Sequence, residues 1–408
     1  MALDQPSLSV VPDQLAAIRD IVAGQLPAYL DDLRRLVNVD CGSYTKAGVD
    51  EVGAWTGERL ASLGAAVERS PSEELGDTWV ARFDSGRPGL RALLIGHLDT
   101  VFDPGTAAAR PFLIEGERAY GPGVTDMKSG LLAGLYAIDA LRQSGGDEWL
   151  PFERLVFVAN PDEEIGSIES GPIIRREAAD ADVCFVLECA RANGDIVSSR
   201  KGILDLRLSI AGRAAHAGVE PEKGRSAILE AAHKTIALHA LNGRWPGVTC
   251  NVGVLRGGTR PNVVAEQATL EVDLRAPVHA HLEAAEAALM AIASAATVPD
   301  TRCTIEEMGR HWPMEKLERS ARLVELAQAI AGELGFELHD AATGGASDAN
   351  TTAGMGAPTL DGLGPIGGND HSPAEYLEIG SIVPRVTLLA GLLLATANDP
   401  QARRWRRG

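Results

Sequence analysis

Three short apolar runs in the first half of the chain each lead into a histidine or a carboxylate. Residues 91–96 precede His97, residues 155–160 precede Glu163 and Glu164, and residues 183–187 precede Glu188. Runs of this length that are rich in Val, Ile and Phe and bounded by turn residues are typical of buried parallel strands. Because open α/β sheets bind ligands at the carboxyl ends of their strands, we expect these side chains to share one site.

Two further segments add ligand-type residues to this set. Asp126 lies in the glycine-containing segment 121–128, and His371 lies in a loop near the end of the chain. The candidate metal ligands are then His97, Asp126, Glu164, Glu188 and His371. Imidazole and carboxylate ligands without a thiolate suit Zn²⁺, and Co²⁺ or Mn²⁺ less exclusively. Five protein ligands are too many for one open catalytic zinc, but they fit two metals about 3.5–4 Å apart that share a bridging carboxylate and a water.

Two acidic residues beside these ligands predict further roles. A two-metal centre polarises a carbonyl and activates a water molecule, so a general base must accept the proton of that water. Glu163, next to Glu164, is the natural candidate. Asp99, two residues after His97, is expected to accept the second imidazole N–H and to fix its tautomer.

The length of the chain and a change in its pattern predict two domains. A chain of 408 residues exceeds the size of one ordinary core. Residues 203–210 and 270–275 alternate apolar and polar side chains, which is typical of half-exposed antiparallel strands. With the helices expected between and after them, they predict an inserted α+β sandwich of ferredoxin-like type at 199–310. We expect residues 1–198 and 311–408 to form an α/β catalytic domain, whose mainly parallel central sheet is flanked by helices.

Charge and cysteine usage narrow the class of partner. The net charge of −18 argues against nucleic acid or an anionic membrane, because a phosphate surface would repel the chain. No uninterrupted apolar run reaches the roughly 20 residues of a membrane helix. The five cysteines are scattered without a CxxC pair, which favours reduced thiols in the cytoplasm. Residues 1–20 lack the pattern of a signal peptide, although a leader removed earlier stays compatible with the sequence.

The motifs resemble those of the co-catalytic zinc metallopeptidase family, which includes glutamate carboxypeptidase, acetylornithine deacetylase, succinyl-diaminopimelate desuccinylase and aminoacylase. The resemblance covers about residues 90–397 and rests on five segments in order, namely 96–99, 121–128, 162–167, 212–218 and 369–372. Each segment alone is a moderate signal, whereas the ordered set is strong. The glutamate carboxypeptidase branch is the most similar.

The resemblance implies a role for each residue of the metal site. His97, Asp126 and Glu188 would hold one zinc, and Asp126, Glu164 and His371 the other, with Asp126 bridging. Glu163 would act as the general base and then as the acid that protonates the leaving amine. A cis peptide bond between Asp126 and Met127 is also implied, which is rare for a bond without proline.

The resemblance also implies a homodimer that forms through the inserted domain. His216 of that domain would reach the active site of the partner and stabilise the oxyanion. Asn262 and Arg275 match positions that hold the carboxylate of the substrate, a task that suits the fork of a guanidinium. Gly345 lies in a glycine loop like the one that contacts substrate in the carboxypeptidase branch, and Arg310 is a looser candidate for a substrate carboxylate.

The expected function is that of a dinuclear zinc carboxypeptidase, which releases a C-terminal amino acid from a peptide or N-acyl amino acid. One departure concerns the substrate: segment 189–198 lacks the lysine that helps to hold a glutamate side chain in the glutamate carboxypeptidase branch, and Arg191 is its sole basic residue. The alternative is an N-acyl-amino-acid deacylase, which would prefer small acyl groups. A non-catalytic binding protein of the same fold is a third interpretation, and the retention of Glu163 with all five ligands speaks against it.

Overall fold

The computed structural model describes residues 12–406, which divide into two compact units. Of these residues, the large unit comprises 12–198, 316–342 and 347–406, and the small unit comprises 199–315 and 343–346. The chain thus returns to the large unit at Lys316, a few residues later than the boundary expected after residue 310. The reason is that the last strand of the small unit runs to His311 and stays paired within that unit.

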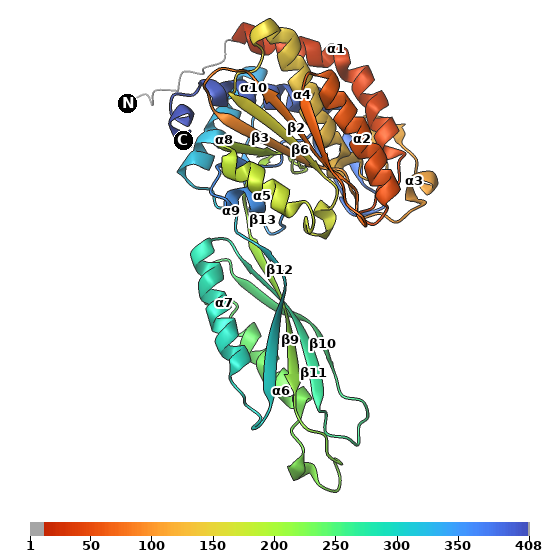
Figure 1. Ribbon diagram of the computed structural model, residues 1–408, viewed down its shortest axis with the longest axis vertical. Helices are drawn as coiled ribbons and strands as arrows, with labels where there is room; N and C mark the ends of the chain where they lie inside the picture. Colours follow the sequence, from red (N-terminus) through yellow and green to blue (C-terminus); the bar gives the residue numbers. More distant parts are fainter. Residues whose placement is uncertain (1–11, 407–408) are drawn as a thin grey trace. The chain divides into compact units, whose positions relative to one another are not determined.

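A six-stranded sheet forms the centre of the large unit (Figure 1). Its order is β1 (Ala66–Ser70), β2 (Thr78–Asp84), β6 (Arg154–Asn160), β3 (Arg91–His97), β7 (Val183–Val186) and β14 (Thr359–Leu360). Neighbours from β6 to β14 are parallel, whereas β1 and β2 form an antiparallel pair at one edge. The three apolar runs of the sequence are the strands β3, β6 and β7, as predicted.

Helices cover both faces of this sheet. The helices of the large unit are α1 (Pro12–Val37), α2 (Lys46–Ser62), α3 (Thr106–Ala109), α4 (Ser129–Gly145), α5 (Gly171–Asp180), α8 (Glu318–Leu334), α9 (Asp348–Gly354) and α10 (Ile382–Asn398). Ala92 and Leu94 join the large core that α1, α4 and α10 form, whereas the alternate residues Leu93 and Ile95 are buried outside it. Because side chains alternate along a strand, the latter two lie on the face where α5 packs on β3.

A second sheet of the large unit places two loops side by side. It consists of β4 (Leu113–Glu115), β5 (Arg118–Tyr120), β16 (Tyr376–Glu378) and β15 (Gly367–Gly368). Tyr376 pairs with Tyr120 in the antiparallel ladder of β16 and β5. The segment that follows β5 and the segment that precedes β16 therefore meet, although about 250 residues separate them in the chain.

The small unit is an α+β sandwich. Its sheet has the order β10 (Thr249–Gly257), β11 (Gln267–Ala276), β9 (Gly202–Ala211) and β12 (Arg302–His311), and all neighbours are antiparallel. Helices α6 (Ala227–His239) and α7 (His279–Ser294) pack on it and share its core. The succession of strand, helix, two strands, helix and strand is the ferredoxin-like arrangement expected from the sequence. The strands β8 (Ile196–Arg200) and β13 (Asp340–Thr343) form a separate two-stranded sheet.

Among the described residues, one helix is long and apolar enough to cross a membrane by length and composition alone. It covers Ile379–Asn398, but 78% of its apolar window is buried inside the protein. Helix α10 packs there against α1, α4 and α8, and the buried Arg385 donates hydrogen bonds to backbone carbonyls of the large unit. These contacts are those of a core helix.

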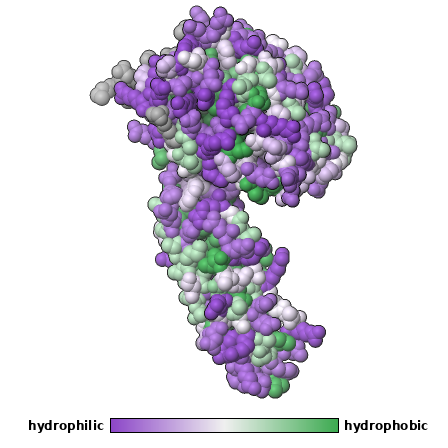
Figure 2. Space-filling model, viewed as in Figure 1, coloured by the Kyte–Doolittle hydropathy of each residue, from purple (hydrophilic) through white to green (hydrophobic). Residues whose placement is uncertain are grey.

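Hydrophilic residues cover most of the visible face of the large unit (Figure 2).

Candidate metal centre

The large unit brings all five candidate metal ligands together. His97 is the last residue of β3, Glu164 lies in the turn Glu163–Ile165 after β6, and Glu188 follows β7. Asp126 lies in the segment Val124–Lys128 that precedes α4, and its backbone angles are not helical. His371 lies in the loop between β15 and β16. The sheet therefore presents its ligands at the carboxyl ends of three parallel strands, as expected for an open α/β fold.

Asp126 lies between the two histidines. Its Oδ1 atom lies 3.2 Å from Nε2 of His97, and its Oδ2 atom lies 3.0 Å from Nε2 of His371. Glu188 lies on the side of His97, with 3.7 Å between Oε1 and Nε2. Glu164 lies on the side of His371, with 3.3 Å between Oε2 and Nε2. These distances divide the five side chains into two groups that share Asp126, which is the division that the resemblance implies.

The donor set fits divalent metal ions. The ligand atoms of His97, Asp126 and Glu164 lie within 4.8 Å of one another, and so do those of His97, Glu163 and Glu188. The side chain of Glu164 is 6% exposed, and its Oε1 atom accepts no hydrogen bond from the residues that the structure describes. A buried carboxylate oxygen without a partner costs free energy that a bound cation would recover. Imidazole nitrogen and carboxylate oxygen without sulfur are the donors that zinc and related ions accept in such sites.

The ionisable groups of the cluster shift one another's pKa values. Burial raises the pKa of Glu163 well above its usual value, and the charge of Glu188 adds to this effect. Burial acts against the protonation of His97, but the neighbouring carboxylates, Glu188 first, raise its pKa well above the usual value. Hydrogen bonds to Asp126 and Glu164 raise the pKa of His371 to about 11. The raised pKa values of these groups favour their protonated forms when no metal is bound. A metal ion that binds the same nitrogen and oxygen atoms therefore displaces protons.

Asp99 contacts more of the site than the sequence suggests. His97 Nδ1 lies 3.0 Å from the main-chain oxygen of Asp99 and 3.4 Å from its Oδ1 atom, which leaves Nε2 facing Asp126. The carboxylate also accepts hydrogen bonds of 3.2 Å from the backbone N–H groups of Glu163 and Glu164. The hydroxyl of Ser43 donates a third, at 2.6 Å. One buried carboxylate thus fixes both the imidazole and the turn that carries Glu163.

Glu375 is a residue of the site that sequence reasoning missed. Its carboxylate is buried and accepts hydrogen bonds from the backbone N–H groups of Gly123, Thr125 and Asp126. Burial raises the pKa of Glu375 to about 7, although these three hydrogen bonds act in the opposite direction. A glutamate four residues after His371 was the available signal.

The peptide bond between Asp126 and Met127 is cis, which is the geometry that the resemblance implies.

The loop that carries His371 has an unusual backbone. Both Asn369 and His371 have positive φ angles, of 59° and 60°. Residues other than glycine adopt this left-handed conformation at a cost of about 1–3 kcal/mol, and such residues cluster at functional sites. The hydroxyl of Ser372 donates to the main-chain oxygen of Asn369 at 2.6 Å, which supports the turn. The surrounding structure therefore holds His371 in an unfavourable backbone conformation, in which its imidazole points at Asp126.

The remaining candidate residues belong to the small unit. Arg275 donates from Nε and Nη2 to the carboxylate of Asp273, and from Nη1 to the main-chain oxygen of Gly344 at 2.8 Å. This arrangement holds the guanidinium in place and leaves further N–H donors at its outer edge. Asn262 and Gly345 are exposed. His216 is also exposed, and its Nδ1 atom accepts a hydrogen bond of 3.2 Å from the backbone N–H of Gly218.

Arg310 is the candidate residue least suited to bind substrate. Its guanidinium donates four hydrogen bonds, two to Glu286 and two to Glu307. A guanidinium has five N–H donors, so one remains, and a substrate carboxylate that binds through two N–H groups would have to displace one of these partners. The guanidinium also lies over the ring of Trp312, with 5.0 Å between Cζ and the ring centroid, which restricts it further. The structure therefore gives Arg310 the role of an ion pair that joins β12 to α7.

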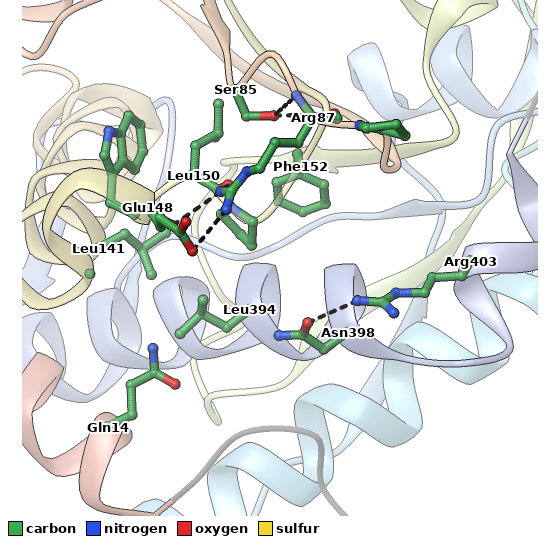
Figure 3. Close-up of a pocket in the computed structure, with 14 residues that line it drawn as sticks. Gln14, Ser85, Arg87, Leu141, Glu148, Leu150, Phe152, Leu394, Asn398 and Arg403 are labelled. Carbon is green, nitrogen blue, oxygen red and sulfur yellow. Dashed lines mark hydrogen bonds and ion pairs between the residues drawn. The ribbon is translucent and has the colours of Figure 1, made fainter.

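A cavity of about 410 Å³ lies elsewhere in the large unit (Figure 3). Its lining includes Arg87 in the loop before β3, and Trp149 and Phe152 in the loop before β6. These loops enter the amino ends of the two strands, whereas the candidate metal ligands follow the carboxyl ends. In Figure 3 the guanidinium of Arg87 is occupied by Glu148 and the main-chain oxygen of Leu150. The cavity is therefore separate from the metal centre.

Comparison with known proteins identifies the family. A sequence model described as Peptidase family M20/M25/M40 matches residues 93–395. The chain belongs to this peptidase family. Carboxypeptidase G2 of Pseudomonas sp. (strain RS-16) is 31% identical over 373 residues, which cover 90% of this chain and 89% of that protein. Acetylornithine deacetylase of Edwardsiella ictaluri is 28% identical over 397 residues, which cover 90% of this chain and 98% of that protein.

Solved structures of similar proteins share the fold. Aminopeptidase PepT from Bacillus cereus superposes with a TM-score of 0.76 at 24% identity, over 91% of this chain and 98% of that one. A metallo-carboxypeptidase, Sso-CP2 from Sulfolobus solfataricus, gives a TM-score of 0.68 at 17% identity, over 90% and 98% of the two chains. These likenesses confirm the α/β fold with an inserted domain.

Membership of the peptidase family confirms three expectations from the sequence. The resemblance to metallopeptidases is correct, the fold is of the expected class, and the chain is an enzyme of the peptidase and amidohydrolase class. The family consists of metal-dependent hydrolases, and the cluster around Asp126 is a possible metal site of this chain. The number and identity of the metals belong to the proposal that follows.

Proposed function

We propose that the protein is a dinuclear zinc-dependent exopeptidase, which releases a C-terminal amino acid from a peptide or an N-acyl amino acid. The observation that carries the proposal is the position of Asp126, whose two oxygens face the imidazoles of His97 and His371 at 3.2 and 3.0 Å. A carboxylate that faces ligands on both sides suits a bridge between two metals. The similarity to carboxypeptidase G2 supports an exopeptidase with this specificity for the chain end.

In this proposal five side chains hold the metals. His97 and Glu188 would bind the first zinc, His371 and Glu164 the second, and Asp126 both. Two zinc ions bound there would polarise the scissile carbonyl and increase the acidity of a water molecule. Co²⁺ and Mn²⁺ are substitutes that the same donors accept.

Glu163 moves the proton. Its backbone N–H is anchored to Asp99, and its carboxylate lies within 4.8 Å of the ligand atoms of His97 and Glu188. The carboxylate accepts the proton of the attacking water and then delivers it to the nitrogen of the leaving amine. Burial raises the pKa of this carboxyl group above its usual value, which helps it to hold the proton between the two steps.

Arg275 is the residue that we propose for the substrate carboxylate. Asp273 and the main-chain oxygen of Gly344 orient its guanidinium, so less rotamer entropy is lost when a carboxylate binds the free edge. Asn262 and Gly345 are exposed and would add hydrogen bonds to the same substrate. Arg310 has no part in this proposal, since two glutamates occupy it.

A homodimer through the small unit is the oligomer that we propose. Helix α6 and the edge strand β10 expose four large apolar side chains, namely Ile228, Leu229, Ile236 and Leu255. Helix α6 packs against β10, and apolar side chains gathered on neighbouring elements are typical of an interface. His216 would then act in the partner's site, where its Nε2–H would stabilise the oxyanion. The hydrogen bond that Nδ1 accepts from Gly218 favours the tautomer with its proton on Nε2.

The cytoplasm is the compartment that we propose for the enzyme. All five cysteines are free in the structure, and three of them are buried. Unpaired buried thiols suit a reducing compartment.

A deacylase that acts on N-acyl amino acids is the second candidate. The similarity to acetylornithine deacetylase over 98% of that protein favours it, and so does the lack of a lysine in residues 189–198. A panel of N-acyl amino acids and dipeptides separates the two functions. An exopeptidase would accept peptidyl and bulky acyl groups, whereas a deacylase would prefer acetyl and other small groups.

The panel also tests the proposed function itself. Protein with measured zinc content is assayed before and after treatment with a chelator, and again after zinc is restored. We expect about two zinc ions per chain and hydrolysis that the chelator abolishes and zinc restores. Zinc-supplemented protein that binds no metal, or hydrolysis that is indifferent to chelation, would contradict the proposal.

A further inference from the structure

One buried carboxylate holds the loop that carries Asp126 by its backbone N–H groups. The Oε2 atom of Glu375 accepts from the N–H of Gly123 at 2.9 Å, and its Oε1 atom accepts from Thr125 at 2.9 Å and from Asp126 at 3.1 Å. Glu375 is 1% exposed, and no cation of the described residues forms an ion pair with it. Backbone N–H groups are therefore the partners of this carboxylate, as they are of anions at anion-binding loops.

A buried cation joins the same loop to the segment that follows α1. The ammonium of Lys128, which is 1% exposed, donates to the main-chain oxygens of Pro122 at 3.1 Å and Val39 at 3.2 Å. Gly123 is packed on a third side, because a β-carbon there would lie 2.5 Å from Cγ2 of Thr100. Three contacts thus hold the loop: Glu375 accepts from three of its N–H groups, Lys128 donates to the carbonyl of Pro122, and Gly123 packs closely against Thr100.

The position of Glu375 in the chain links it to the other imidazole of the centre. It lies four residues after His371 and one residue before β16. The backbone N–H of Glu375 donates to the main-chain oxygen of Ser372 at 3.2 Å, so the intervening segment is a turn. Glu375 therefore belongs to the same short loop as His371, and its carboxylate accepts hydrogen bonds from the loop of Asp126.

We propose that Glu375 is a positioning residue, which fixes the distance between Asp126 and His371 and thereby sets the affinity of the centre for its second metal. The proposal rests on the proposed function in one respect, the assignment of Asp126 and His371 as ligands. Without the three hydrogen bonds the contact of Lys128 and the packing of Gly123 remain, but the N–H of Asp126 loses its anchor, so the carboxylate can shift relative to His371. Residues that orient metal ligands typically contribute about 10- to 100-fold in metal affinity.

The substitution Glu375→Gln tests this role with little change in volume. In either orientation the amide places an N–H donor opposite at least one of the three backbone N–H groups, which removes a hydrogen bond and adds a repulsion. The matched control is Glu378→Gln on β16, because Glu378 is partly exposed and pairs with Arg118 at 3.1 Å. Both variants lose one carboxylate from the same short segment.

Three readouts separate positioning from a structural contribution. We expect Glu375→Gln to weaken the binding of the second zinc by about 10- to 100-fold in competition with a chelator. The visible spectrum of the Co²⁺-loaded protein should change, because it reports the geometry of the ligands, and kcat should fall while KM stays within about twofold. The control variant should keep the affinity, spectrum and kcat of the unchanged protein.

A folded Glu375→Gln variant with unchanged metal affinity and an unchanged Co²⁺ spectrum would overturn the proposal. If this variant does not fold, Glu375→Asp decides the question: it keeps the charge but is one methylene too short to reach all three N–H groups. The aspartate variant should fold and lose metal affinity, and full affinity in it would equally contradict the proposal. Metal affinity lost in a protein that hydrolyses no member of the panel would refute the proposed function and leave the positioning role standing.

Discussion

Asp273 holds Arg275 from two residues away on the same strand, with its Oδ2 atom 2.8 Å from Nη2 and its Oδ1 atom 3.0 Å from Nε. The pair occupies one edge of the guanidinium, and Gly344 accepts from Nη1. A side chain held in this way is ready to bind a planar carboxylate through its remaining N–H groups. The relationship makes the role of Arg275 testable by a conservative change.

The substitution Arg275→Lys should raise KM about 10- to 100-fold, because a charge-assisted hydrogen bond contributes about 1.5–3 kcal/mol and lysine cannot form the parallel pair. The fall in kcat should be smaller. Steady-state kinetics on the best substrate of the panel provide the measurement. Arg207→Lys on β9 is the matched control, since Arg207 pairs with Glu271 and Glu306 on the small unit. Equal KM values for both variants would refute this role.

Glu163→Gln should lower kcat by at least about 100-fold while zinc content stays the same, because general-base catalysis contributes factors of that size. The amide cannot accept the proton of water, but it keeps the volume and the backbone anchors of the turn. Metal analysis and kinetics on the same preparation give both quantities. Glu169→Gln, an exposed position of the same segment, should behave as the unchanged protein. Near-normal turnover in Glu163→Gln would remove Glu163 from the mechanism.

Mixing two inactive variants tests whether His216 acts in the partner's site. His216→Ala and Glu163→Gln each disable both sites of their own homodimers. In a mixed dimer one site combines Glu163 of one protomer with His216 of its partner. Random exchange of subunits should restore about a quarter of the activity, because half of the dimers are mixed and one of their two sites is complete. Mixed dimers that form without any recovery would show that His216 acts within its own chain or not at all.

The ion pair between Glu230 and Lys234 should stabilise the small unit. The pair is 2.9 Å long, and its side chains are 1% and 3% exposed. Loss of one partner of a buried pair costs about 3–5 kcal/mol, so Lys234→Met should lower the unfolding midpoint in urea clearly. Lys223→Met, at an exposed pair with Glu220, should change the free energy of unfolding by less than about 0.5 kcal/mol, so its midpoint should stay close to that of the unchanged protein. Equal midpoints for the two variants would show that the buried pair adds no stability.

The same pair should make stability depend on pH. Burial acts against the ionisation of Glu230, but hydrogen bonds from Val298 and Lys234 lower its pKa below the ordinary value of 4.5. Because the folded pKa is lowered, this contribution is complete above about pH 4.5 and is lost as the pH falls through the folded value. Urea titrations at several pH values should show a weaker decline below pH 4.5 in Lys234→Met than in the unchanged protein. Parallel declines would contradict the linkage.

Much of the site was predictable because its ligands follow recognisable strands. The apolar runs before His97, Glu163 and Glu188 have the length and composition of parallel strands, and such strands end at one edge of a sheet. The family motifs then order the remaining pieces along the chain. The alternating strands of the inserted unit were predictable for a similar reason, since one face of an antiparallel sheet is buried and the other is not.

The partners of charged side chains were not predictable in the same way. Arg310 and Arg275 lie in similar strand contexts, yet Glu286 and Glu307 occupy the first, whereas the second keeps a free edge. Four residues at 343–346 group with the small unit although the chain around them belongs to the large one. Such differences depend on neighbours that are distant in the chain.

The sequence by itself determined the strand ends, the ligand types and the family, because these follow from local periodicity and from ordered motifs. The tertiary structure alone decided that Asp99 anchors the turn of Glu163 and that Glu375 accepts hydrogen bonds from a loop about 250 residues away. The physical reason is that a hydrogen bond to a backbone N–H carries no requirement on the identity of the residue that donates it. Local sequence therefore holds no record of these contacts, which form only when the two sheets of the large unit bring the loops together.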